Sequence, residues 1–353
     1  MKKPKVSIVC ISYNHENFIE DALKGFLLQK TDFQVEIIIA DDCSQDKTAE
    51  IISKYAKEHT NINAVLRNKN IGVQKNLLEA MDMAKGEYIA LCEGDDFWTD
   101  PNKLQLQVDF LDKNKDYSVC FHQVEVYFEN DEKKSYLSPD DTMVKGDGEV
   151  PINQLLADNI IPTNSVLYRQ TNDYLNLNMH VLPLDWYLHL HHAKAGKIHY
   201  ISREMAKNRR HDSGLWWAAQ QEPGAIWIKH TDGWIELFEE FLSMFKDQKT
   251  QTDIIKQNIS NFFEAILRKK TVEEYREFIF NLKTKDALFE YLSEWSVQRA
   301  PVLEDEVHSI SQHADNQGDI ISHQTDKINN MQEKINELEN TPWHRLKTKL
   351  KIK

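Results

Sequence analysis

Short apolar segments and amphipathic segments alternate through the first 120 residues of the chain. Apolar, partly β-branched runs predict buried strands at residues 6–12, 35–40, 64–66 and 88–92. Apolar residues at three-to-four spacing predict helices at residues 17–28, 47–55 and 73–84. This alternation indicates an α/β fold with a mostly parallel sheet covered by helices on both faces. Because ligands of such sheets bind beyond the carboxyl ends of the strands, the residues that directly follow each strand are the first candidates for a functional site.

The middle of the chain has a mixed pattern. Further strands are expected at residues 119–128, 164–168 and 198–201, and a helix at residues 184–193. The polar segment 131–147, which contains Pro139 and Gly146, is expected to be a loop.

From residue 223 onward the pattern is helical. Helices are expected at residues 226–245, 254–267, 272–282 and 287–295. They define a helical subdomain at residues 223–300, which follows the α/β domain at residues 1–222.

Residues 301–341 carry apolar side chains in a heptad register that lasts about five heptads. This register predicts an oligomerising coiled coil, so a homo-oligomer is expected; a helix that folds back on its own domain is the alternative. Residues 342–353 form a basic amphipathic tail that favours an anionic membrane surface. A solvated chain terminus is the alternative for the tail.

The charge of the chain bears on its partners. The formal net charge is −13, which disfavours nucleic-acid binding because phosphate contacts need clustered Lys and Arg. A phosphorylated small molecule would then be held through a metal cation. The four cysteines form no CxxC pair, and no segment is long and apolar enough to span a bilayer. The protein is expected in the cytoplasm, and the basic tail adds the expectation that it attaches peripherally to the inner face of the cell membrane.

The strongest chemical signal is the acidic run that follows the strand at residues 88–92. Glu93, Asp95 and Asp96 stand within four positions of one another. Mg²⁺ or Mn²⁺ prefers such hard oxygen ligands and commonly bridges one or two carboxylates to substrate phosphates. The alternative is an acidic turn that caps the helix starting at Asn102.

Two further groups follow the first two strands. Ser12, Tyr13 and Asn14 could hold a flat base through backbone groups and an aromatic ring. Asp41 and Asp42 could accept a base N–H or a ribose hydroxyl. Turn and N-cap roles are the alternative for the second segment.

Together these segments resemble family 2 glycosyltransferases, bacterial inverting enzymes with the Rossmann-like GT-A fold. The resemblance is carried by VSIVCISYN, EIIIADDCSQDKT, NKNIGVQKN and AKGEYIALCEGDDFWTDPNKL, covers about residues 4–110 and continues more weakly to residue 217. It implies transfer of a sugar from a nucleotide diphosphate donor, UDP by default, to a hydroxyl of a glycan or lipid-linked acceptor in surface polysaccharide biosynthesis.

The resemblance also implies site residues. Nucleotide-binding roles fall on Ser12, Tyr13, Asn14, Asp41, Asp42, Lys75 (or Asn70), Glu93 and Gly94. Asp95 would bind Mn²⁺ or Mg²⁺ together with His211. Contacts with the diphosphate or the acceptor fall on Asp96, Trp98, Arg209, Arg210 and Trp216.

The catalytic base that the resemblance requires is assigned to Asp185, in the segment LPLDWYL. It would take a proton from the acceptor hydroxyl; a role as the N-cap of the next helix is the alternative. Residues 208–217 resemble an Arg-x-His loop that closes over the donor, and a basic surface loop is the alternative there.

Two other functions compete with this one. A sugar-nucleotide nucleotidyltransferase also has a Rossmann-like sheet, but it would open with a glycine-rich, arginine-containing loop where this chain has Tyr13-Asn14-His15-Glu16. A non-catalytic, transferase-like scaffold built around the coiled coil is the other alternative.

Overall fold

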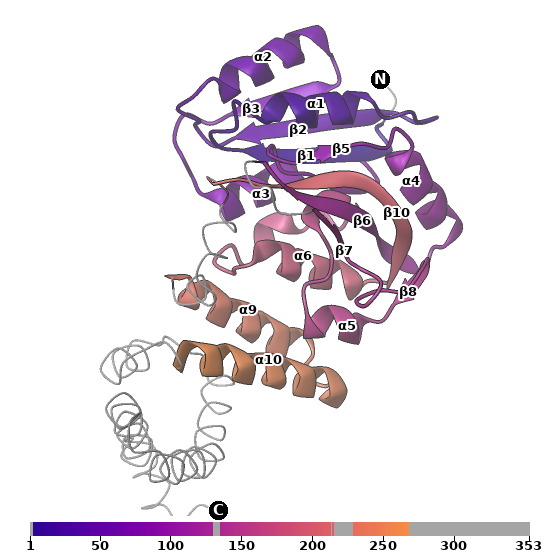
Figure 1. The fold of residues 1–353 in the computed structure, drawn as a ribbon, viewed down its shortest axis with the longest axis vertical. Helices are drawn as coiled ribbons and strands as arrows, with labels where there is room; N and C mark the ends of the chain where they lie inside the picture. The colour runs from indigo at the N-terminus through magenta and orange to yellow at the C-terminus, as the bar shows by residue number, and fades with distance from the viewer. Residues whose placement is uncertain (1–2, 130–134, 213, 215–228, 268–353) are drawn as a thin grey trace, which may run out of the picture. The chain divides into compact units, whose positions relative to one another are not determined.

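The computed structural model describes residues 3–129, 135–212, 214 and 229–267 of the 353-residue chain (Figure 1). Its contacts divide the chain into two compact units, Met1–Ile226 and Trp227–Lys353. The strands of the first unit are β1 (Val6–Ser12), β2 (Val35–Asp41), β3 (Ile62–Leu66), β4 (Tyr88–Leu91), β5 (Phe97–Trp98), β6 (Tyr117–Phe128), β7 (Tyr136–Ser138), β8 (Gly148–Val150), β9 (Leu167–Arg169) and β10 (Lys197–Arg210). Its helices are α1 (Ile19–Leu27), α2 (Thr48–Glu58), α3 (Val73–Asp82), α4 (Lys103–Lys113), α5 (Ile152–Ala157), η1 (Thr163–Ser165), η2 (Tyr174–Asn176) and α6 (Leu184–Ala193).

One sheet runs through the first unit in the order β3-β2-β1-β4-β9-β6-β10-β5. β1 pairs in parallel with β2 and β4, β2 with β3, and β6 with β10. β9 lies antiparallel between β4 and β6. Consequently β3, β2, β1, β4, β6 and β10 all run in the same direction, and their carboxyl ends share one edge of the sheet. The expected α/β fold with a mostly parallel sheet is confirmed.

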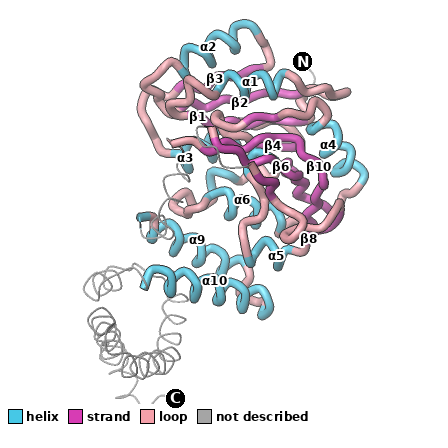
Figure 2. The backbone as a smooth tube through the Cα atoms, viewed as in Figure 1, coloured by secondary structure: helices cyan, strands magenta, loops and turns pink. Residues whose placement is uncertain are grey.

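Helices cover both faces of this sheet: α1 and α2 lie on one side, and α3 and α6 on the other (Figures 1 and 2). α1 shows why such a segment becomes a covering helix. Its apolar residues Ile19, Leu23 and Phe26 recur at three-to-four spacing and are buried in the same core cluster as alternate residues of β1. Glu20 and Asp21 in its first turn favour the helix by facing the positive end of its dipole.

Two expectations for the middle of the chain were wrong in detail, and a third strand is longer than expected. The expected loop 131–147 contains the short strand β7, which pairs with β6. The expected strand 164–168 begins as the 3-10 turn η1, and only β9 is extended. The expected strand 198–201 is part of β10, which runs on to Arg210 because it pairs with β6 along its length. Residues 208–210 therefore lie in a strand and not in a loop.

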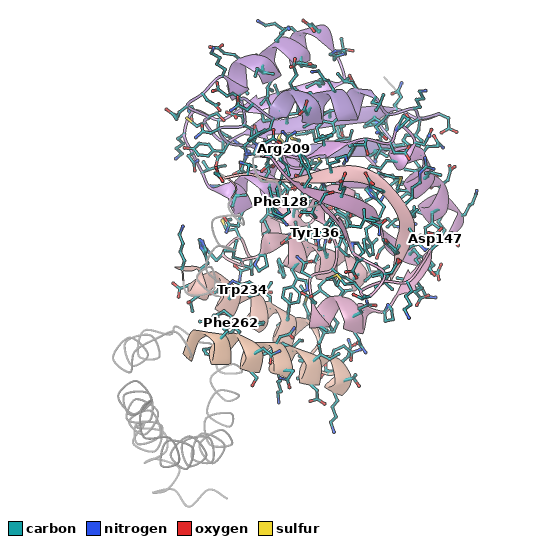
Figure 3. The ribbon with its side chains drawn as sticks, in the orientation of Figure 1. Phe128, Tyr136, Asp147, Arg209, Trp234 and Phe262 are labelled. Atoms are coloured by element: carbon teal, nitrogen blue, oxygen red, sulfur yellow. The ribbon has the colours of Figure 1, made fainter. Side chains whose placement is uncertain are left out.

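The described part of the second unit consists of α9 (Thr231–Met244) and α10 (Lys249–Leu267). Trp234 and Phe238 of α9 contact Phe262 of α10 with ring centroids 5.8 and 5.5 Å apart, respectively (Figure 3). The helices expected at 272–282 and 287–295, the coiled coil at 301–341 and the tail at 342–353 lie outside the described residues. In the part that is described, no helix is long and apolar enough to cross a membrane.

Candidate active site

The candidate site lies at the edge of the sheet where the parallel strands end. β1 ends at Ser12, β2 at Asp41, and the acidic segment 93–96 follows β4. β6 and β10 end there as well, with Phe128 paired to Arg210. Strand direction therefore brings together polar residues that lie far apart in the chain.

Hydrogen bonds join the loops after β1 and β2. Ser12 Oγ donates to Asp41 Oδ1 at 3.0 Å, and the backbone N–H of Ser44 donates to Asp41 Oδ2 at 3.0 Å. Asn14 adopts a positive φ of 58°, and its Oδ1 accepts from the backbone N–H of Gln45 at 2.8 Å. Tyr13 stands between these anchored residues with 43% of its surface exposed. The loops thus present an exposed aromatic ring on a fixed backbone.

Asp42 and Lys75 have contacts of their own within the chain. The Asp42 carboxylate is buried and accepts from the backbone N–H groups of Ile71 and Gly72 at 2.8 and 2.9 Å. It therefore anchors the loop before α3. Lys75, in the first turn of α3, keeps a half-exposed side chain that approaches Glu79 to 3.8 Å.

The acidic segment after β4 is held against β1. The backbone N–H of Gly94 donates to the carbonyl of Ile11 at 2.9 Å. A Cβ at residue 94 would lie 2.9 Å from His15 Nδ1 and 2.9 Å from Ile19 Cδ1, so any larger residue would force these side chains to shift. Gly94 therefore acts in the structure as a close-packing point that sets the position of Asp95.

The Asp95 carboxylate has two imidazoles near it. Its Oδ2 lies 3.2 Å from His211 Nε2 and 3.9 Å from His15 Nε2. Burial disfavours the charged form of Asp95, but the two histidines outweigh this effect and hold its pKa below the ordinary value. The structure thus brings Asp95 and His211 together, as the sequence predicted for a shared site.

The other two carboxylates differ from Asp95. Asp96 is buried and accepts from the Arg209 backbone N–H and from Asn208 Nδ2, both at 2.7 Å. Burial and the charge of Asp95 raise the pKa of Asp96 to about 8. Burial and the charges of Asp96 and Asp95 likewise raise the pKa of Glu93 well above its ordinary value. Such a cluster favours a neighbouring positive charge.

Asp185 lies in the first turn of α6, whose N-cap is Pro183, so the alternative N-cap role of Asp185 was wrong. Its Oδ2 accepts from Asn159 Nδ2 at 3.0 Å and from Thr163 Oγ1 at 3.3 Å. Burial is the main cause of the raised pKa of Glu93, and the charge of Asp185 adds a smaller contribution in the same direction.

Two residues that were expected to contact the diphosphate or the acceptor, Trp98 and Arg209, have side chains that are buried and bonded within the chain. The Trp98 indole is 2% exposed, packs on Phe26 and donates from Nε1 to the Asn164 carbonyl, so it belongs to the core. The Arg209 guanidinium is buried and donates to acceptors of the chain itself, at the end of β10 (Figure 3). Arg210 is half-buried, and its Nε has no hydrogen-bond partner. Trp216 lies outside the described residues.

The residues present fit a divalent metal ion. Asp95 offers an oxygen and His211 a nitrogen in one place, and two further carboxyl groups, those of Glu93 and Asp96, stand in the same short segment. Among the described residues, no three His, Cys, Asp or Glu side chains form a complete metal cage. A site with few protein ligands matches Mg²⁺ or Mn²⁺ that takes its remaining ligands from substrate phosphates and water.

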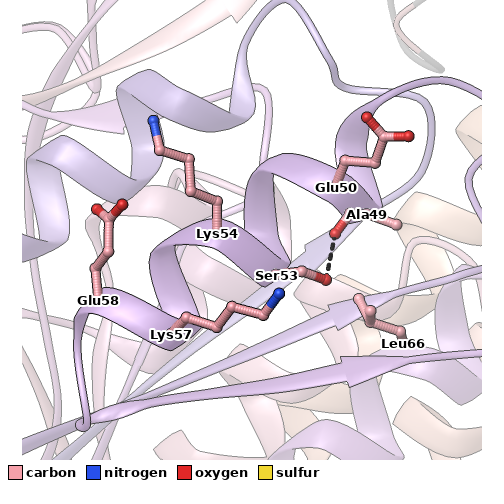
Figure 4. A pocket seen from close by; sticks show the side chains of 7 residues that line it. All are labelled: Ala49, Glu50, Ser53, Lys54, Lys57, Glu58 and Leu66. Atoms are coloured by element: carbon pink, nitrogen blue, oxygen red, sulfur yellow. Dashed lines mark hydrogen bonds between the residues drawn. The ribbon is translucent and has the colours of Figure 1, made fainter.

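A surface hollow of about 470 Å³ lies over α2, beside Leu66 at the end of β3 (Figure 4). Its lining residues are Ala49, Glu50, Ser53, Lys54, Lys57, Glu58 and Leu66. They include none of the acidic residues after β4, and the lysines and glutamates balance each other in charge. The hollow is therefore not the candidate site.

Sequence reasoning missed three residues that shape the site. His15 approaches Asp95, and Asp21 and Glu129 pair with Arg209. His15 follows directly on the SYN segment, so its place after β1 was a usable signal. No local pattern marks Asp21 or Glu129, because their role depends on where the ends of β6 and β10 meet α1.

Comparison with known proteins gives both a family and a fold. Glycosyl transferase family 2 matches residues 7–176. A Mycobacterium tuberculosis (strain ATCC 25618 / H37Rv) relative, named only as an uncharacterized protein, is 41% identical over 251 residues, which are 71% of each chain. TuaG of Bacillus subtilis (strain 168), named provisionally as a teichuronic acid biosynthesis glycosyltransferase, is 36% identical over 109 residues, 31% of this chain and 42% of TuaG.

Solved structures of other proteins share the fold. S. aureus TarS in complex with UDP superposes with a TM-score of 0.55 at 20% identity, over 78% of each chain. The mannosyltransferase PcManGT from Pyrobaculum calidifontis, in complex with GDP-Man and Mn²⁺, superposes with a TM-score of 0.50 at 14% identity, over 79% of this chain and 80% of PcManGT. The GT-A fold expected from the sequence is thereby confirmed. With a matching family profile and relatives named as glycosyltransferases, the chain belongs to glycosyl transferase family 2 and is a glycosyltransferase.

Proposed function

We propose that this glycosyltransferase moves a sugar from a UDP-sugar to a hydroxyl of a glycan or lipid-linked acceptor, in a reaction that requires Mn²⁺ or Mg²⁺ and inverts the anomeric carbon. The observation that carries the proposal is the Asp95 carboxylate at the carboxyl edge of the sheet, with His211 Nε2 3.2 Å away. TarS, a structural neighbour, is described with UDP, and PcManGT with Mn²⁺. TuaG, whose name refers to teichuronic acid, supports a role in surface polysaccharide biosynthesis.

The chain's own residues divide the work of this reaction. Tyr13, with its exposed ring, stacks on the base, and Asp41 with Ser12 fixes the loop that surrounds the nucleoside. Asp95 and His211 hold the metal ion, which when bound neutralises charge on the departing diphosphate. Arg210, whose Nε lacks a partner, supplies a further positive charge there.

Asp185 acts as the general base in this proposal. Its carboxylate takes the proton of the acceptor hydroxyl while the hydroxyl oxygen forms a bond to the anomeric carbon. The bond from that carbon to the diphosphate oxygen breaks at the same time, and the electron pair leaves with the nucleoside diphosphate. Asn159 and Thr163 donate to Asp185 Oδ2 and so orient the carboxylate.

A panel of nucleotide sugars tests the proposal. We expect Mn²⁺ and the correct donor together to raise the melting temperature, because a ligand that binds only the folded state stabilises it. The same mixture should release the nucleoside diphosphate slowly in the absence of an acceptor. No stabilisation and no release with any donor would favour the non-catalytic scaffold. In a separate assay, formation of a nucleotide sugar and pyrophosphate from a nucleoside triphosphate and a sugar phosphate would favour the nucleotidyltransferase.

A further inference from the structure

Each of the three guanidinium nitrogens of Arg209 donates a hydrogen bond to an acceptor within the protein. Its side chain is 4% exposed. Nε donates to the backbone carbonyl of Asp95 at 3.0 Å, Nη1 to Glu129 Oε2 at 3.0 Å and Nη2 to Asp21 Oδ2 at 2.8 Å. The three acceptors come from the acidic segment, the residue after β6, and α1. A single side chain thus joins three segments that meet at the candidate active site.

The same guanidinium also lies over the ring of Phe18. Arg209 Cζ is 4.7 Å from the Phe18 ring centroid, and the His211 ring is 4.5 Å from that centroid. The Phe18 ring therefore contacts both the Arg209 guanidinium and the His211 ring. His211 and the Asp95 main chain are consequently both supported by Arg209, one through Phe18 and the other through a direct hydrogen bond.

We propose that Arg209 is a positioning residue that fixes Asp95 and His211 relative to each other, so that they bind one divalent cation, and that it does not contact the substrate. This inference rests on the proposed function. All three guanidinium nitrogens already have acceptors in the chain, so Arg209 has little capacity left for a phosphate. Removing an outer partner that orients metal ligands typically weakens metal affinity.

Two variants disrupt the hydrogen bonds of Arg209, one by changing Arg209 itself and the other by changing its carboxylate partners. Arg209→Lys keeps the charge but lacks the planar fork that reaches three acceptors. The double variant Asp21→Asn, Glu129→Gln leaves Arg209 intact and removes the two carboxylates that hold it. The readout is the paramagnetic resonance signal of free Mn²⁺ during titration of the protein with Mn²⁺ in the presence of UDP, which measures metal affinity without turnover.

If Arg209 positions the ligands, both variants should bind Mn²⁺ about tenfold more weakly than the wild type. If Arg209 instead contacts a phosphate of the substrate, a different result is expected. The double variant would then free the guanidinium group of Arg209, and the affinities for Mn²⁺ and UDP would be unchanged or higher. An unchanged Mn²⁺ affinity in the double variant would therefore overturn the inference. Since Asp21 and Glu129 are partly exposed, this variant is expected to fold even where Arg209→Lys does not.

Arg203→Lys is the matched control, because Arg203 lies on the same strand and pairs with a carboxylate, Asp100, away from Asp95. It should keep the wild-type Mn²⁺ affinity. The inference and the proposed function fail in different ways. If the wild-type protein binds no Mn²⁺ with UDP, the proposed function fails; if it binds and the double variant binds equally well, only the role of Arg209 is wrong.

Discussion

Asp95 differs from the neighbouring carboxylates Glu93 and Asp96 in its surroundings and in its pKa. Two imidazoles, from His15 and His211, face one of its oxygens and lower the pKa of its carboxyl group against the effect of burial. Glu93 and Asp96 have raised pKa values in the same segment. The environment therefore distinguishes three carboxylates within four positions, because only that of Asp95 has a lowered pKa.

The base assignment predicts a loss of turnover without a loss of donor binding. In Asp185→Asn the amide has nearly the same shape but cannot take a proton, so kcat should fall about 10²- to 10⁴-fold. UDP affinity, measured by calorimetry with Mn²⁺, should stay the same. Asp173→Asn, which changes a partly exposed carboxylate paired with His191, is the control and should keep wild-type turnover. Wild-type kcat in Asp185→Asn would rule out Asp185 as the base.

The close packing at Gly94 predicts that any side chain at this position lowers the stability of the protein. In Gly94→Ala, the new Cβ would lie 2.9 Å from both His15 Nδ1 and Ile19 Cδ1. Overpacking of this kind typically destabilises by about 1–3 kcal/mol. We expect a lower free energy of unfolding in urea, with part of it recovered in the double variant Gly94→Ala, His15→Ala. An unchanged free energy of unfolding in Gly94→Ala would show that the neighbours move aside freely.

Among the elements, α4 begins with a lysine that is completely buried. Lys103 Nζ donates to Gln107 Oε1 at 2.8 Å and lies 4.0 Å from the Trp98 ring centroid. Burial lowers its pKa to about 7 from an ordinary 10.5. Above pH 7 the unfolded chain therefore binds more protons than the folded chain, and this lysine makes stability rise with pH until both forms are neutral.

Lys103→Met should remove that contribution. Stability measured by urea unfolding should depend less on pH in the variant than in the wild type across the range from about pH 7 to about pH 10. Any stabilisation by the substitution should be larger at the lower end of this range than at the upper end. Lys113→Met, an exposed position on the same helix, is the control and should retain the wild-type slope. Equal slopes in all three proteins would mean that Lys103 keeps its ordinary pKa.

Elements with a strong local pattern could be predicted from the sequence, and elements that depend on distant partners could not. The strands β1, β2 and β4 are runs of apolar residues, so their nature is visible locally. The final residues of β10 are polar and basic, and they are extended only because β6 lies beside them. The closeness of Asp95 and His211 was expected from the family resemblance of the segments that contain them, whereas the buried contacts of Arg209 depend on the spatial meeting of β6, β10 and α1.

For the whole molecule, the C-terminal tail predicts a partner for the enzyme. Residues 342–353 carry Arg345, Lys347, Lys349, Lys351 and Lys353. Each basic residue near an anionic bilayer contributes about 1 kcal/mol. Deletion of residues 342–353 should therefore lower co-sedimentation with phosphatidylserine-containing vesicles and leave the weak background with phosphatidylcholine vesicles unchanged. Equal sedimentation of the full-length and shortened proteins with anionic vesicles would reject the membrane role.

The proposed reaction depends on a cation that links Asp95 to a nucleoside diphosphate. Calorimetric titration of UDP into the protein with Mn²⁺, and again into Asp95→Asn, tests this link most directly. We expect the wild type to bind UDP and the variant to bind it at least about tenfold more weakly, since removal of a metal ligand removes the bridge to the phosphates. Equal UDP affinity in the two proteins, or no binding to either, would contradict the account.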